Sequence, residues 1–194
     1  ADGGFNAVQD MSPSTQTQDS KQYRGLADNF VKMGYQKGLS LFAVPYDFRL
    51  NHMANSVYYS LERTIRYAFE LTGKKVVIMA HSLGNVNTLS VLNRMSQDDK
   101  DKMVAAYIAL TPAIGGTPGT IRTHVGGDEG SLKMGGLVGL KSRNQKLMYS
   151  SLSSVYELMP GDFFFRFKNE TWMQEIIARV EAEEKYDIRT LEGW

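Results

Sequence analysis

Ser82 is the residue whose neighbours most clearly indicate catalysis in this sequence of 194 residues. It stands in A-H-S-L-G at residues 80–84, which has the form G-x-S-x-G with Ala in place of the first Gly. Between a buried strand and a helix, this pentapeptide holds a serine in a sharp turn with its hydroxyl clear of the sheet. The sequence therefore predicts Ser82 as a nucleophile, with a turn that serves packing or phosphate binding as the alternative.

The two residues beside Ser82 are expected to have different roles. Leu83 begins the following helix, and its backbone N–H points to where a tetrahedral oxyanion would form, so we expect it to contribute to an oxyanion hole. Adjacent residues at a sharp turn point in different directions. His81 is therefore expected to be a structural residue that lines the site, with a catalytic role as the alternative.

Hydrophobic periodicity predicts the elements that must position Ser82. Apolar runs at residues 76–80 and 104–110 are typical of strands buried on both faces. A further strand is expected at residues 39–44, ended by Pro45. Helical spacing predicts helices from Tyr23 to Gly34 or Gly38, over residues 54–71 with Gly73 as C-cap, and over residues 84–95. This alternation indicates an α/β fold with a parallel sheet.

The remaining segments are less regular. Residues 1–20 are polar and predict a flexible arm, whereas residues 21–194 are expected to form part of one domain. The glycine-rich residues 111–150 predict a long functional loop, a lid or cap. Within it, residues 131–140 are apolar and punctuated by glycine, which suits a lid that opens at a lipid surface, with a core loop as the alternative.

Composition excludes several classes of function. The 22 Lys and Arg residues balance 21 Asp and Glu, so no basic surface for nucleic acid is expected. The longest apolar run, residues 104–110, is far shorter than the ~20 residues of a membrane-spanning helix. Cysteine is absent, which excludes disulfides, thiol catalysis and zinc–thiolate sites. No metal or cofactor is expected.

Further motifs follow one another in the order of a known family. P-Y-D-F-R-L at residues 45–50 looks like P-Y-D-W-R-L, and A-H-S-L-G-N at residues 80–85 looks like A-H-S-M-G-N. Residues 111–116, 127–130 and 169–171 stand where the family has G-A-P-W-G-G, G-D-N and N-Y-T. The chain resembles the lecithin:cholesterol acyltransferase-like family, with its lysosomal phospholipase A2 and phospholipid:diacylglycerol acyltransferase relatives.

The resemblance implies an α/β-hydrolase fold, of which this chain holds a part. It implies that Ser82 attacks a phospholipid acyl ester at a lipid surface and forms an acyl-enzyme, which passes its acyl group to water or to a lipid alcohol. Asp47 and Arg49 are expected to form an internal ion pair that shapes the site. The alternatives are a general lipase or carboxylesterase and an inert lipid-binding relative.

A base for Ser82 is not evident. In this fold the base is a His oriented by Asp or Glu, in the chain order Ser, Asp/Glu, His. Of His52, His81 and His124, only His124 follows Ser82, and it comes too early for the base. We expect it to be a loop or lid residue. The catalytic Asp and His are therefore expected outside residues 1–194, on an associated second polypeptide, with a part of the chain that is not given as the alternative.

Two features bear on processing and localisation. The sequence begins at Ala1, which suits a mature, processed product or a partial chain. N-E-T at residues 169–171 is an N-glycosylation sequon, and Asn169 also suits a helix N-cap. With the resemblance, the sequon favours the secretory pathway, either secretion or a vacuolar or lysosomal location.

Overall fold

The computed structural model describes residues 3–8, 23–54, 56–126 and 142–161. The chain divides into two compact units. The first comprises Ala1–Pro112 and Met134–Val138, and the second comprises Ala113–Lys133 and Gly139–Trp194. Ser82 and its neighbours belong to the first unit.

The first unit contains a parallel pair of strands. β1 (Val76–His81) pairs with β2 (Val104–Leu110), with His81 opposite Leu110 at the carboxyl ends. Two helices connect the strands, α3 (Leu83–Arg94) and α4 (Gln97–Met103). The strands, their parallel direction and α3 confirm the sequence prediction. An α/β arrangement with a parallel sheet is therefore established for the described residues.

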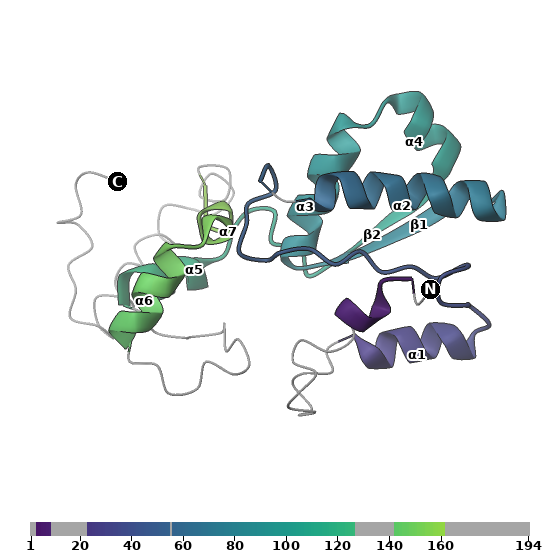
Figure 1. The fold of residues 1–194 in the computed structure, drawn as a ribbon. Coiled ribbons are helices and arrows are strands. Elements are labelled where there is room, and N and C mark those ends of the chain that lie inside the picture. Colours follow the sequence, from purple (N-terminus) through teal and green to yellow (C-terminus); the bar gives the residue numbers. More distant parts are fainter. Residues whose placement is uncertain (1–2, 9–22, 55, 127–141, 162–194) are drawn as a thin grey trace. The chain divides into compact units, whose positions relative to one another are not determined.

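Helices pack on one side of the strands. α2 (Val57–Thr72) ends at Gly73, whose φ of 64° fits the predicted C-cap. Figure 1 shows α2, α3 and α4 together above the strands. The core comprises Val57, Leu61, Ile65, Ile78, Val91, Met95 and Met103. α1 (Arg24–Lys32), which contributes no residue to this core, lies within the helix predicted from Tyr23.

The apolar runs of the two strands predicted that both faces of the sheet are buried, but one face is partly exposed. Ile78 lies in the core, but the side chains of Val77 and Met79 are 55% and 37% exposed, and Ile108 is 39% exposed. Successive side chains of a strand point to opposite faces. The face opposite the core helices is therefore not fully covered by the part of the chain that the structure describes.

The segment before α2 differs from its prediction. Instead of a strand over residues 39–44, the described backbone has an isolated bridge between Lys37 and Leu41 and an extended stretch. The Ala43 N–H donates to the carbonyl oxygen of Gly3 at 2.7 Å. Residues 3–8 include a 3₁₀ turn, η1 (Phe5–Ala7), with a buried Phe5, which differs from the predicted flexible arm. Residues 9–20 lie outside the described residues.

In the described part of the second unit, residues 118–126 and 142–150 are helical where a long irregular loop had been predicted. α5 (Pro118–Gly126), α6 (Ser142–Ser150) and α7 (Ser153–Glu157) occupy much of its described part. Thr120 is fully buried, and its hydroxyl donates to the carbonyl oxygens of Thr117 and Leu158 at 2.6 and 3.0 Å. The predicted lid at residues 131–140 lies outside the described residues.

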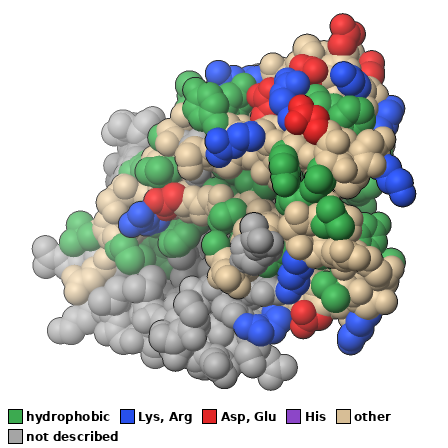
Figure 2. Space-filling model, turned by 45° about the vertical axis from the view of Figure 1, so that its right-hand side comes forward, with side chains coloured by type: hydrophobic (Ala, Val, Ile, Leu, Met, Phe, Trp, Pro, Cys, Tyr) green, Lys and Arg blue, Asp and Glu red, His purple; other side chains and the backbone are tan. Residues whose placement is uncertain are grey.

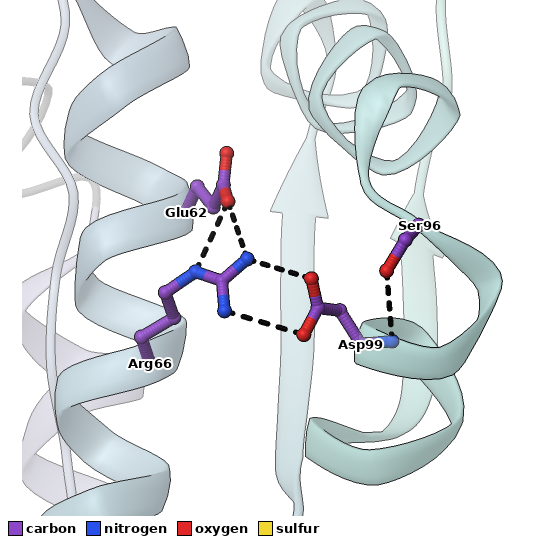
Figure 3. A network of polar contacts seen from close by, with 4 residues as sticks. All are labelled: Glu62, Arg66, Ser96 and Asp99. Carbon is purple, nitrogen blue, oxygen red and sulfur yellow. Dashed lines mark hydrogen bonds and ion pairs between the residues drawn. The ribbon is translucent and has the colours of Figure 1, made fainter.

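An ionic cluster joins α2 to α4 (Figure 3). Arg66 donates to Glu62 Oε1, one turn earlier, and to both carboxylate oxygens of Asp99, at 2.7–3.3 Å. Ser96 caps α4 by accepting the Asp99 N–H at 3.1 Å. The hydrogen bonds from Arg66, and then that from Ser96, lower the pKa of Asp99 below its usual 3.8. On the face seen in Figure 2, acidic and basic side chains alternate with apolar ones.

Candidate active site

Ser82 occupies the turn between β1 and α3 in an uncommon backbone conformation. Its φ and ψ are 51° and −123°, and it is the N-cap residue of α3. Positive φ is unfavourable for a residue with a side chain, and the surrounding structure must stabilise it. The Ser82 N–H donates to the carbonyl oxygen of Leu110, the last residue of β2, at 3.1 Å. This is the strained strand-to-helix turn that a nucleophilic serine requires.

Leu83 is the first residue of α3 and is buried. The first N–H groups of a helix have no acceptor within the helix and lie at the positive end of its dipole. The Leu83 amide therefore lies beside Ser82 at the positive end of the α3 dipole, and its role in an oxyanion hole stays a prediction.

Small residues surround the turn. A Cβ added at Gly84 would lie 3.8 Å from the Tyr46 hydroxyl and 3.9 Å from Ala80 Cβ, which leaves room for a methyl group. Tyr46 comes from the P-Y-D-F-R-L segment, so this segment lies against the turn. Burial, and then the nearby Tyr23, raise the pKa of Tyr46 to about 12, so its hydroxyl stays neutral at physiological pH.

His81 contacts Tyr23. The Tyr23 hydroxyl lies 2.7 Å from His81 Nδ1, and the two rings meet edge to face with centroids 5.8 Å apart. His81 thus has a partner for one ring nitrogen and is half-buried beside the nucleophile. The structural role of His81 stays a prediction.

Asp47 and Arg49 form the predicted ion pair. Arg49 Nε and Nη2 donate to the two carboxylate oxygens of Asp47 at 2.8 and 2.7 Å, and the Arg49 N–H adds a third bond at 3.0 Å. These hydrogen bonds lower the pKa of Asp47 to about 2. The pair is not internal, because the side chain of Arg49 is 64% exposed.

His124 is not a loop residue. It lies in α5, is buried, and has Ser150 Oγ 3.3 Å from Nδ1 and the Tyr156 ring against its own. Burial, and then Lys146, lower the pKa of His124 below 6.5, which favours the neutral ring. His124 therefore belongs to the packing of the second unit rather than to a loop.

Asn85 has a set of contacts that the sequence did not predict. Its Nδ2 donates to the carbonyl oxygens of Ser82 and Leu110 at 2.9 and 3.2 Å. Its Oδ1 accepts the Tyr107 hydroxyl proton at 2.6 Å. The sequence shows only that residue 85 is polar. Its burial and its partners depend on how β2 pairs with β1.

Among the described residues, no group of three or more His, Cys, Asp or Glu side chains could hold a metal ion. No helix in the described ranges is long and apolar enough to cross a membrane. Asn169 lies outside these ranges.

Comparison with known proteins agrees with the geometry around Ser82. Residues 1–193 match the family described as lecithin:cholesterol acyltransferase. The chain belongs to this family. The resemblance that the motifs indicated is thereby confirmed.

The relatives have enzymatic names. The chain is 35% identical to the lysosomal phospholipase A and acyltransferase of Bos taurus over 80% of its own length and 36% of that protein. The Rattus norvegicus protein of that name is 30% identical over 92% of the chain and 40% of its own length. The phosphatidylcholine-sterol acyltransferase of Gallus gallus is 25% identical over 75% and 35%. The chain thus spans less than half the length of these relatives.

Proposed function

We propose that this member of the lecithin:cholesterol acyltransferase family has an α/β-hydrolase fold and is a serine-dependent phospholipase and acyltransferase with Ser82 as its nucleophile. The observation that carries the proposal is the positive φ of Ser82 at the carboxyl end of a parallel strand, directly before a helix. The names of the relatives support the substrate class, since they are phospholipases or phospholipid-dependent acyltransferases.

The proposed reaction has two steps. Ser82 Oγ bonds to the acyl carbon of a phospholipid ester, a base takes the hydroxyl proton, and the oxyanion accepts a hydrogen bond from the Leu83 amide. The ester C–O bond breaks, and the lysophospholipid leaves with that proton. Water or a lipid alcohol then bonds to the acyl carbon, and the Ser82 ester bond breaks as Ser82 regains a proton.

The base and its acid are proposed to come from outside residues 1–194. His81 already has Tyr23 at Nδ1, and His124 has Ser150 and Tyr156 as partners within the second unit. Relatives that are more than twice as long have further residues that could carry an Asp and a His. A second polypeptide and a longer chain are the two sources, and the intact mass of the purified protein with everything that co-purifies distinguishes them.

Asp47, Arg49 and His81 are proposed to shape the site rather than to react. Asp47 and Arg49 use their charges on each other, and they lie next to Tyr46, which contacts the turn at Gly84. The protein is further proposed to act at a lipid surface in the secretory pathway, either secreted or in a vacuolar or lysosomal setting. The name of the lysosomal relatives supports the lysosomal location.

Labelling with a fluorophosphonate tests the proposal. In the native protein, Ser82 Oγ should bond to phosphorus and displace fluoride. Ser82→Ala should abolish both labelling and fatty-acid release from phosphatidylcholine vesicles. Ser90→Ala, on the same helix, is the matched control and should retain both.

Two results would contradict the proposal. An unlabelled Ser82 in the native protein would identify an inert lipid-binding relative. A labelled Ser82 with neutral esters hydrolysed and phospholipid vesicles left intact would identify a general lipase or carboxylesterase.

A further inference from the structure

We propose that Asn85 is a positioning residue that holds Ser82 and the Leu83 amide in their reactive arrangement. The inference rests on the proposed function of Ser82. It goes beyond that function because it assigns a role to a side chain that is neither nucleophile, acid, base nor oxyanion donor.

The contacts of Asn85 converge on the nucleophile turn. Its side chain is fully buried, and its carboxamide binds the carbonyl oxygens of Ser82 and Leu110 as well as the Tyr107 hydroxyl. The Asn85 backbone N–H also donates to the Ser82 carbonyl oxygen, at 3.0 Å. Asn85 thus links the start of α3, the turn itself and the carboxyl end of β2.

The Ser82 carbonyl oxygen accepts two hydrogen bonds from Asn85, one from its side chain and one from its backbone. This carbonyl and the Leu83 N–H belong to the same peptide group, which is planar. Two hydrogen bonds from Asn85 that fix the direction of the C=O therefore also fix the direction of the N–H. The proposed oxyanion donor is held in place by a side chain that does not touch the substrate.

The Leu110 carbonyl oxygen is the second shared acceptor. It accepts one hydrogen bond from the Ser82 N–H and one from Asn85 Nδ2. These two hydrogen bonds connect the turn to the end of β2. A residue at positive φ persists only where the surrounding structure over-determines it. Thr111, the next residue after Leu110, also has positive φ, at 39°. The Asn85 contacts constrain the backbone at this place, where Ser82 and Thr111 both have positive φ.

Asn87 provides a matched control on the same helix. Like Asn85 it is buried, with 2% of its surface exposed, but neither its Nδ2 nor its Oδ1 has a hydrogen-bond partner in the part of the chain that the structure describes. Replacement of each asparagine by Leu therefore makes the same chemical change at two buried positions, and only one of them binds the turn.

The first experiment compares Asn85→Leu, Asn87→Leu and Tyr107→Phe in the full-length natural protein. Asn85→Leu should lower kcat on phosphatidylcholine vesicles, and the labelling rate of Ser82, by about 100-fold with KM nearly unchanged, as expected for a displaced reacting group or oxyanion donor. Tyr107→Phe removes one contact and should lower both by about fivefold. Asn87→Leu should change neither by more than about twofold. Wild-type labelling and kcat in Asn85→Leu or in Tyr107→Phe would overturn the proposal.

A conservative variant separates positioning from packing. Asn85→Asp keeps the size of the side chain, but an ionised carboxylate cannot donate to the two carbonyl oxygens, whereas a protonated carboxyl can donate to one. The labelling rate of this variant, divided by the wild-type rate at each pH, should rise as pH falls and the carboxyl becomes protonated. A ratio that does not depend on pH would overturn the proposal.

Hydrogen exchange keeps this inference distinct from the proposed function. If wild-type Ser82 fails to label, the proposed function is wrong, but the exchange rate of the Ser82 amide, which donates to the Leu110 carbonyl oxygen, still reports on the contacts of Asn85. Tyr107→Phe should raise this exchange rate by about fivefold relative to Asn87→Leu. Equal exchange in the two variants would contradict the role of Asn85 whatever the catalytic result.

Discussion

Arg66 and Asn85 each lie at the centre of a polar cluster that joins segments distant in the chain, but the two clusters differ in burial. Arg66 joins α2 to α4 through Asp99 (Figure 3), and its side chain is 40% exposed. Asn85 joins α3 to β2 and has no exposed surface. Water competes more strongly for the bonds of Arg66 than for those of Asn85, whose side chain is fully buried. Loss of the buried partner therefore leaves unsatisfied polar groups, whereas loss of the exposed one does not.

This difference explains which cluster can hold a strained turn. An exposed ion pair is weakened by salt and by water, and its long side chains lose conformational freedom when they pair. A buried amide between fixed carbonyl oxygens has one low-energy arrangement. The neutral, buried cluster lies next to Ser82, and the charged cluster fastens two helices whose core contacts already hold them.

The largest expected effect on stability comes from Asn85. Asn85→Leu should lower the free energy of unfolding by about 3 kcal/mol, because the partly buried Tyr107 hydroxyl loses its acceptor and two carbonyl oxygens each lose a donor. Tyr107→Phe should cost about 1 kcal/mol. Since the two residues share a hydrogen bond, the double variant should cost less than the sum of the two single effects. Urea unfolding of the four proteins measures this coupling, and strictly additive losses would show that the two side chains act independently.

The next effect has the opposite sign and concerns Asn87. A buried carboxamide without partners is unfavourable, so Asn87→Leu should raise the free energy of unfolding by about 1 kcal/mol. Thermal unfolding measures the change, with Asn87→Ala as the control that removes the carboxamide without filling its volume. A lower Tm for Asn87→Leu would show that the asparagine makes a favourable interaction, and it would weaken the contrast with Asn85.

The elements that carry Ser82 could be predicted from local pattern. Apolar runs and helical spacing indicated β1, α3 and β2, and Gly73 marked the end of α2. The pattern failed at α4, because its sequence QDDKDKM has no apolar period, although Ser96 with acidic residues in the first turn is a recognisable N-cap. It also failed at residues 39–44, where hydrogen bonds to Gln36 and Gly3 replace a ladder.

The partners around Ser82 could not be predicted in the same way. Asn85 and Asn87 are the same residue type, two positions apart, on one helix, and both are buried. Their difference depends on the pairing of β2, which places Tyr107 and Leu110 within reach of Asn85. Similarly, Tyr23 is 58 residues from His81, so their contact has no local signature. Tertiary register, rather than residue type, decides which polar side chains support the nucleophile.

The smallest expected effect concerns Arg66, and its pH dependence distinguishes the two clusters. Arg66→Leu should lower Tm by no more than about 3 °C at low salt and by less at high salt. The hydrogen bonds from Arg66 lower the pKa of Asp99 in the folded protein. Their contribution is therefore fully present above the usual pKa of 3.8 and is lost as pH falls through the lowered one.

The comparison of variants makes this prediction specific. Between pH 7 and pH 2, the Tm difference between wild type and Arg66→Leu should shrink toward zero. That for Asn85→Leu should stay constant, because its partners do not ionise in this range and the pKa of Tyr107 is raised above 10. Asp47, whose pKa is about 2, is present in every protein compared, so its own titration cancels. Arg63→Leu, at an exposed position of α2, controls for the loss of a positive charge. An equal pH dependence for Arg66→Leu and Asn85→Leu would mean that the cluster beside Ser82 contains an ionised group, and the contrast between the two would then be wrong.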